Sequence, residues 1–292
     1  MKGEVKIETP EGRGEVNMAL MLSYIEKDSP IHRLSGLTKL VVFLLWSVLT
    51  MAGYDTRVML GLCATGAVLF IISRTQLAEV SFIFKMLFFF MALNILAIYV
   101  FAPEQGVLIY GTRHIIVNGV GRWTLTAEQL FYEFNLILKY ISVVPVAILL
   151  IVTTHPSEFA ASLNRIGVSY SIAFAVSLTL RYIPDVQRDY KTISQSQQAR
   201  GLELSAKAHP LKRLKGAANI LLPLIFSSLD RIDVISRAME LRGFGKNKKR
   251  TWFAEKPFSS ADKVILLMSV LLFGFALWFT FKNGSRFYNP FK

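Results

Sequence analysis

The sequence predicts an all-α polytopic membrane protein, with about five transmembrane helices and a separate helical domain in the cytoplasm. Three observations lead to this prediction. Hydrophobic residues make up 53% of the 292 residues, and the mean hydropathy is +0.43. The apolar residues form long blocks instead of scattered periodic positions. The net charge of +13 is unevenly placed, with most of the basic residues in one long segment after the fourth block.

Apolar blocks define the predicted spans, since crossing the hydrocarbon core takes about 20 mostly apolar residues. Three blocks are clear and a fourth is nearly as good. A fifth block is short, but Arg57 and Arg74 flank it, as in a span whose end residues reach the interface. In chain order the five blocks are residues 40–52, which can be extended back to Leu34, then 58–72, 82–101, 130–152 and 264–281.

Basic residues give the predicted orientation in the membrane. Residues 154–256 contain seventeen Lys and Arg against eight Asp and Glu, whereas residues 102–129 contain two of each kind. Positive charge favours the cytoplasmic side, and the first thirty residues lack the apolar core of a signal peptide. We therefore expect a cytoplasmic N-terminal segment (1–30), four spans (31–153), a cytoplasmic domain (154–256), and a last span with an outer tail (257–292).

Several classes of function lack their usual residues in this sequence. Cys63 is the only cysteine, and the histidines (His32, His114, His155 and His209) lack ligand spacing, so we expect neither a metal site nor a cofactor. Motifs for ATP binding and for hydrolytic catalysis are absent, which predicts a non-catalytic chain. The basic segment has no aromatic stacking platform, so lipid headgroups are a simpler partner than nucleic acid. Charges within the clear spans are few (Lys85, Glu133 and Lys139), which favours a protein that moves with a partner supplying the energy.

The cytoplasmic domain is expected to contain one short amphipathic helix and two long helices. Pro156 and Glu158 mark the start of the short helix, which should reach about Ile166. Residues 169–183 and 220–229 are apolar, and each block continues without a turn into a charged amphipathic half. These two blocks could be further spans, which would give seven. The preferred interpretation is two long helices whose polar halves project into the cytoplasm, the first kinked at Pro184.

Each long helix runs into an Arg-Gly pair, first at Arg200-Gly201 and again 42 residues later at Arg242-Gly243. Steps of three and four residues back from each arginine follow a mostly apolar stripe. An arginine in the last turn with a glycine beyond it is also an ordinary helix stop. Docking of both helix tips into grooves of a partner explains the shared phase equally well. The stripes consist of Ile183, Val186, Tyr190, Ile193 and Gln197 in the first helix and Ile225, Ser228, Ile232, Ile235 and Met239 in the second.

Five motifs in this order, around a matching hydropathy profile, carry a resemblance to a known family. They are residues 24–34 followed by Thr38-Lys39, residues 153–158, Arg181-Tyr182-Ile183-Pro184, Gln198-Ala199-Arg200-Gly201, and residues 238–244. Together they resemble the transmembrane T component of energy-coupling factor transporters, over nearly the whole chain from about Tyr24. Two departures are Leu241, where the family usually has Ala, and Ser35-Gly36-Leu37, where it commonly has Asp-Pro-Arg; this turn receives no functional assignment.

The resemblance implies a coupling role in a prokaryotic plasma membrane. In that family the T component links two ABC-type ATPase subunits to a small membrane protein, the S component, which captures a vitamin or a transition-metal ion. The two long helices are then coupling helices that cross in an X, and their tips dock into grooves of the ATPases. A stand-alone permease, a membrane enzyme and a structural scaffold are the alternatives. The docking residues implied are Ala199, Arg200, Gly201, Leu241, Arg242 and Gly243.

Overall fold

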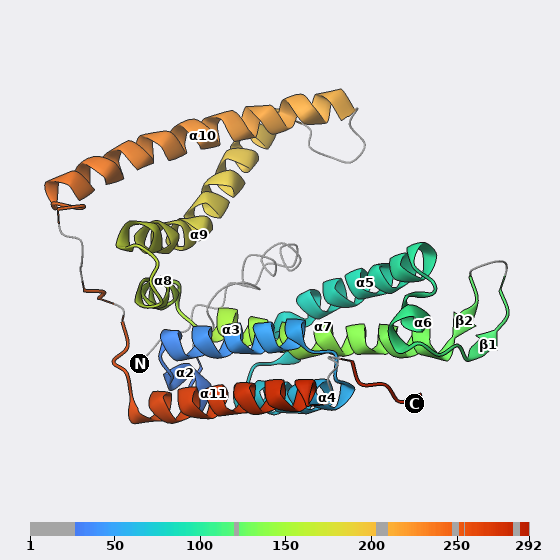
Figure 1. Ribbon diagram of the computed structural model, residues 1–292. Coiled ribbons are helices and arrows are strands. Elements are labelled where there is room, and N and C mark those ends of the chain that lie inside the picture. Colours follow the sequence, from blue (N-terminus) through green and yellow to red (C-terminus); the bar gives the residue numbers. More distant parts are fainter. Residues whose placement is uncertain are drawn as a thin grey trace, which may run out of the picture. The chain divides into compact units, whose positions relative to one another are not determined.

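A computed structural model describes residues 27–119, 123–202, 210–246, 251–253, 255–282 and 287–291. These residues fall into two compact units. The first, called the membrane unit below, comprises residues 27–155 and 256–291, and the second, called the helical unit, comprises residues 156–255. Each unit is described separately (Figure 1).

The membrane unit is built from helices, and its five longest ones lie where the sequence predicts spans. The α5, α7 and α11 helices are long and apolar enough to cross a membrane, while α3 and α4 are apolar helices of 17 residues. The all-α membrane fold is therefore confirmed. The unit contains α2 (Pro30–Arg33), α3 (Gly36–Ala52), α4 (Thr56–Ile72), α5 (Leu77–Phe101), α6 (Gln105–Tyr110), β1 (Ile115–Val117), β2 (Leu125–Thr126), α7 (Ala127–Thr153) and α11 (Ser260–Phe281).

Buried polar caps join the beginnings of α3 and α11. Ser259 caps α11, and Asp262 accepts from the backbone N–H of Ser259 at 2.8 Å in a capping box. The same Asp262 carboxylate is fully buried and also accepts from the Ser35 N–H (2.9 Å) and the Thr38 hydroxyl (2.7 Å). Burying a carboxylate is costly unless hydrogen bonds replace its water. The Ser35-Gly36-Leu37 turn thus starts α3 and fixes it to the last span.

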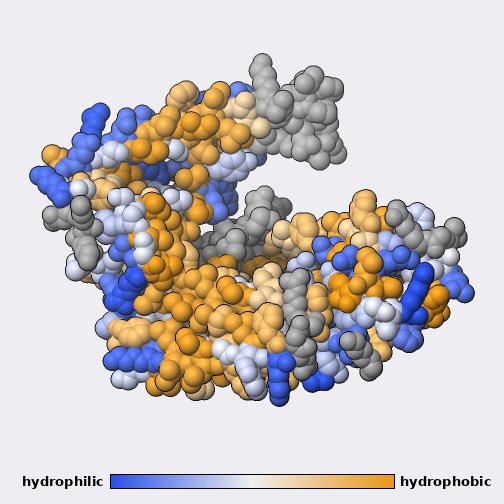
Figure 2. Space-filling model, in the orientation of Figure 1, coloured by the Kyte–Doolittle hydropathy of each residue, from blue (hydrophilic) through white to orange (hydrophobic). Residues whose placement is uncertain are grey.

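The core of the membrane unit lies between α3, α4, α7 and α11, and α7 is its central helix. About half of the most apolar stretch of α7 is buried, whereas α11 and α5 are mostly uncovered. Trp46 of α3 donates from its indole N–H to Ser142 of α7 at 3.0 Å. Figure 2 shows a broad hydrophobic surface over this unit, as expected for helices that face lipid. The cluster consists of Trp46, Leu49, Met59, Leu62, Leu138, Val146 and Ala276.

Two charged residues within α7 face protein. The Lys139 ammonium lies 3.2 Å from the centroid of the Tyr54 ring and donates to the Met51 carbonyl at 3.4 Å. The Glu133 carboxyl accepts from Gln129 at 3.0 Å. Cations are stabilised over aromatic faces, and buried polar groups need hydrogen-bond partners. Both side chains thus interact with other protein groups and not with lipid, as charged residues within a span require.

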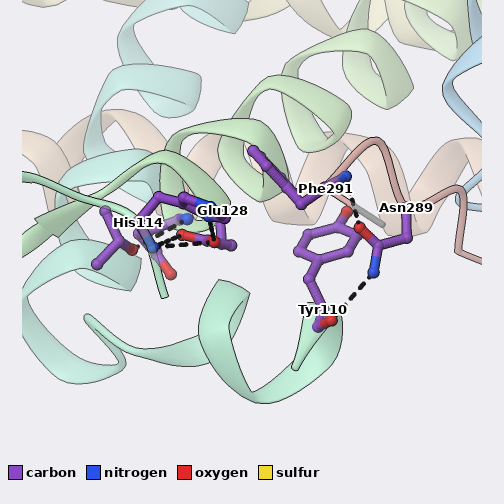
Figure 3. Close-up of polar contacts among 7 residues, drawn as sticks. Tyr110, His114, Glu128, Asn289 and Phe291 are labelled. Carbon is purple, nitrogen blue, oxygen red and sulfur yellow. Dashed lines mark hydrogen bonds and ion pairs between the residues drawn. The ribbon is translucent and has the colours of Figure 1, made fainter. Parts of the chain in front are cut away.

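The C-terminal segment packs against residues that precede α7 in the chain, as the close-up shows (Figure 3). Asn289 donates to the Tyr110 carbonyl at 3.0 Å, and the Phe291 ring stacks on His114 with centroids 5.7 Å apart. His114 also bonds Glu128, at the start of α7, at 2.6 Å. Burial raises the pKa of Tyr110 to about 12, so this phenol stays neutral at physiological pH. Between His114 and Glu128 in the chain, strands β1 and β2 pair antiparallel.

The helical unit consists of one short and two long helices, α8 (Pro156–Arg165), α9 (Tyr170–Ala199) and α10 (Pro210–Leu241). The α9 helix continues through Pro184, and in Figure 1 its first and second parts run in different directions, as expected where proline removes a hydrogen bond. Among the described residues, neither α9 nor α10 combines the length and the apolar composition of a membrane-spanning helix. This result favours two long amphipathic helices over the seven-span alternative.

Candidate site at the helix tips

Both Arg-Gly pairs form the same helix cap. The first cap follows α9, where the Gly201 N–H donates to the Gln198 carbonyl at 2.9 Å and the Leu202 N–H donates to the Gln197 carbonyl at 3.1 Å. The second follows α10 and repeats these bonds from Gly243 to Glu240 (2.8 Å) and from Phe244 to Met239 (2.9 Å). This pattern is the Schellman motif. The repeat in the sequence is therefore a repeat in backbone structure.

Positive backbone φ angles explain why each arginine is followed by glycine. Gly201 has φ of +86° and Gly243 has φ of +66°, a region that residues with a Cβ adopt only at a cost. Arg200 is the last residue before this turn and has φ of −87°. The helix-stop interpretation of the Arg-Gly pairs is confirmed by these caps, and it is compatible with a binding role, because the cap fixes the backbone that carries each guanidinium.

The six predicted docking residues lie together at two tips, three at each. Ala199, Arg200 and Gly201 are exposed at the end of α9, and Leu241 and Arg242 are exposed at the end of α10. Leu241 is 90% exposed, which is unusual for a leucine. Gly243 is partly buried. Both arginine side chains thus lie on the surface of the helical unit at helix ends.

Aromatic rings anchor the second tip to the beginning of α9. Phe244 lies next to Gly243, and its ring lies 4.8 Å from Phe174 and 5.8 Å from Tyr170, between centroids. Trp252 joins the same cluster at 5.3 Å from Tyr170 and donates from its indole N–H to Asn164 at 3.3 Å. An Arg165–Glu255 ion pair lies beside it. The end of α10 is therefore attached to the beginning of α9 through Phe244, and Trp252 connects this cluster to the end of α8.

The two long helices contact each other through an ion pair between equivalent positions. The Arg231 guanidinium of α10 donates to the Asp189 carboxylate of α9 at 2.6 Å, and these residues are 42 positions apart, like the two tip arginines. The Tyr182 ring lies 5.8 Å from the same guanidinium. In Figure 1 the second part of α9 passes behind α10. Sequence reasoning found the tips but missed this pair, although the 42-residue repeat contained the signal.

The predicted apolar stripes are covered only in part. Ile183 and Tyr190 of α9 are 45% and 47% exposed, and Ile225 and Ile232 of α10 are 52% and 55% exposed. Other stripe residues, such as Ile193 and Ile235, are half-buried. Within the described ranges, no cluster of three or more His, Cys, Asp or Glu could hold a metal ion. Both long helices therefore keep exposed apolar residues along their stripes.

Comparison with known proteins identifies the family. The family model described as cobalt transport protein, CbiQ, matches residues 27–252. This chain belongs to the CbiQ family. Relatives named "Energy-coupling factor transporter transmembrane protein EcfT" match over most of the chain and nearly all of their own length. The protein from Lactococcus lactis subsp. cremoris is 27% identical over 87% of this chain and 96% of its own. That from Leuconostoc gelidum is 23% identical over 90% and 97%, and that from Bacillus selenitireducens 28% over 85% and 92%.

These relatives confirm the resemblance to the T component of energy-coupling factor transporters. This CbiQ-family chain is therefore a multi-pass membrane protein and a transmembrane component of a transporter. The family match ends at residue 252 and thus includes both tips, the Asp189–Arg231 pair and Trp252. All features of the helical unit described above, apart from Glu255, lie within it.

Proposed function

We propose that this protein couples two ABC-type ATPase subunits to a small membrane S component, in an importer for a vitamin or a transition-metal ion. The chain itself is non-catalytic in this proposal, and ATP hydrolysis takes place in the partner subunits. The N-terminus and the helical unit face the cytoplasm, where the excess of basic residues in 154–256 favours them. The plasma membrane of a prokaryote is the proposed location.

The observation that carries the proposal is the pair of tips with the same cap and the same Arg-Gly pair. Two long helices of one unit each end in an exposed arginine held by the same Schellman cap. Two similar tips can bind two similar subunits, one at each tip, and a pair of ABC-type ATPases contains two such subunits. A guanidinium remains charged and can bond a carboxylate with two parallel hydrogen bonds. An arginine fixed at the end of a rigid helix can therefore transmit a push or a pull.

The membrane unit supplies the other half of the proposed role. About half of the residues of its α5 helix are exposed, and they include Phe88, Phe89 and Leu96. Partly uncovered apolar residues also lie along α10 in the helical unit, among them Phe226 and Leu229. Apolar faces of these membrane and coupling helices are proposed to receive the S component. The substrate belongs to that partner, so the family description as a cobalt transport protein supports only the broader class of vitamin or metal ion.

Charge reversal at the tips tests the docking proposal. Arg200→Glu and Arg242→Glu should leave the protein in the membrane but reduce copurification of ATPase subunits and substrate uptake. Removing one partner of a buried charge pair costs about 2–5 kcal/mol, which is roughly 30-fold to more than 1,000-fold in affinity. Arg237→Glu is the matched control, since Arg237 is an exposed arginine of α10 that precedes the tip. Wild-type copurification and uptake in the Arg200→Glu/Arg242→Glu double variant would contradict the proposal.

A stand-alone permease is the alternative function, and one reconstitution separates the two. The purified chain in vesicles should move no solute by itself, and uptake should require ATP, the ATPase subunits and an S component together. Transport by the chain alone would support the permease. The scarcity of charged residues within the apolar helices favours the coupling role, because carriers driven by ions use such residues to bind them.

A further inference from the structure

We infer that the Asp189–Arg231 ion pair is the pivot that sets how α9 and α10 cross, and that it acts as a positioning element for both tips. The inference rests on the proposed coupling function and adds a residue pair to it. Arg231 donates to Asp189 at 2.6 Å, and the side chains are 33–34% exposed. A pair this exposed contributes little to stability. Its importance lies in where it fixes the two helices.

The pivot lies at the same distance from both tips. Asp189 is eleven residues before Arg200, and Arg231 is eleven residues before Arg242. The part of each helix between the ion pair and the tip arginine is called an arm. At 1.5 Å per helical residue, each arm is about 16 Å long. Two arms of equal length that meet at their origin transmit a change in crossing angle equally to both arginines. A geometry of this kind requires that the contact between the helices does not slide along either of them.

The sequence repeat explains why an ion pair is needed at this point. When two copies of one helix cross at equivalent positions, a charged residue meets its own counterpart, and identical residues would repel each other. Here the charges are reversed between the copies, since α9 carries Arg188-Asp189 where α10 carries Asp230-Arg231. The reversal converts the contact between equivalent positions into an attraction. A shift that brought Asp230 to the position of Arg231 would place two carboxylates together, so the pair favours the observed register.

Neighbouring groups support the assignment of Asp189 and Arg231 to each other. Arg188 forms an ion pair with Asp185 of its own helix at 3.5 Å, so its guanidinium already has a partner within α9. Tyr182 of α9 also lies close to the Arg231 guanidinium, with its ring centroid at 5.8 Å. Arginine stacks on aromatic faces in a defined orientation. Arg231 is thus held from α9 at two points, by a carboxylate and by a ring.

A charge swap followed by spin-label distances tests the pivot in the full-length protein. Labels are placed at Gln195→Cys and Arg237→Cys, two exposed and equivalent positions six residues beyond the pair, in a Cys63→Ser background. Double electron–electron resonance then measures the distribution of distances between the arms. We expect Asp189→Arg and Arg231→Asp, each alone, to shift and broaden the distribution. The Asp189→Arg/Arg231→Asp double variant should return it to the parent distance and width.

The control is Arg188→Asp, a charge reversal one residue away that leaves the pair intact, and it should keep the parent distribution. Unchanged distances in both single variants would overturn the inference, and so would a double variant as broad as the singles. Uptake by the assembled complex should fall in the singles and recover in the double variant. The spin-label result requires no ATPase, so failure of tip docking and failure of the pivot are distinguishable.

Discussion

The two tips of the helical unit have the same cap but different surroundings. Each ends in arginine and glycine with the same two backbone hydrogen bonds. The next residue differs, because Leu202 follows the first cap where Phe244 follows the second. Phe244 packs against Phe174 and Tyr170 at the beginning of α9. The repeat therefore preserves how each helix ends, and the residue after the cap decides what the tip is attached to.

Because of this difference, the two tips contact different parts of the helical unit. Phe244 joins the end of α10 to the beginning of α9, and Trp252 joins the same cluster to Asn164 near the end of α8, so motion at Arg242 reaches these two helices. Leu202 is partly buried and has no ring to enter such a cluster. Aromatic clusters are worth more than their buried area alone. We expect the α10 tip to resist local opening more strongly than the α9 tip.

Removal of the Phe244 ring should have the largest effect on this comparison. Phe244→Ala loses a partly buried ring and its aromatic contacts, worth about 2 kcal/mol together. Hydrogen exchange at the amides of Gly243 and Phe244 should become about 30-fold faster, since local opening limits it. Leu202→Ala is the matched change at the first tip and should accelerate exchange there by less. Equal effects at the two tips would show that the ring cluster does not distinguish them.

Alanine at the cap glycines should affect both tips alike. Gly201→Ala and Gly243→Ala each force a Cβ into a left-handed conformation, which costs about 1–2 kcal/mol. At Gly201 a Cβ would meet no atom within 4 Å, so the cost there is conformational and not steric. Exchange at each cap should become roughly tenfold faster, and Gly→Asn, which tolerates this conformation better, should have a smaller effect. A large effect at only one tip would mean that the caps are not equivalent.

Local features of the structure could be predicted from the sequence. The five long apolar helices appear where hydrophobic blocks predict them, because burial in lipid and helix formation depend on the composition of each segment. The caps at Gly201 and Gly243 also depend on the local sequence, since glycine adopts positive φ at little cost. Pro184 within a continuous helix was also predictable.

Features that depend on contacts between distant residues were missed. The connection between α5 and α7 contains a short helix and a two-stranded hairpin, and the C-terminal Asn289 and Phe291 pack onto it. No periodic pattern in the sequence predicts these contacts. The Asp189–Arg231 pair and the Phe244 cluster likewise join residues far apart in the chain. Charge reversal at equivalent positions of the repeat was a usable signal for the pair, whereas no sequence pattern places Phe244 on Phe174.

A smaller effect is expected from the polar contact that completes the second tip. Trp252→Phe keeps a ring against Tyr170 but removes the indole N–H that donates to Asn164 at 3.3 Å. A neutral hydrogen bond contributes about 0.5–1.5 kcal/mol, and a long one belongs at the lower end, so exchange at Phe244 should become about twofold faster. Trp252→Ala removes the ring as well and should approach the effect of Phe244→Ala. If Trp252→Phe already equalled Trp252→Ala, the hydrogen bond and not the ring cluster would hold the α10 tip, and the contrast between Leu202 and Phe244 would lose its physical basis.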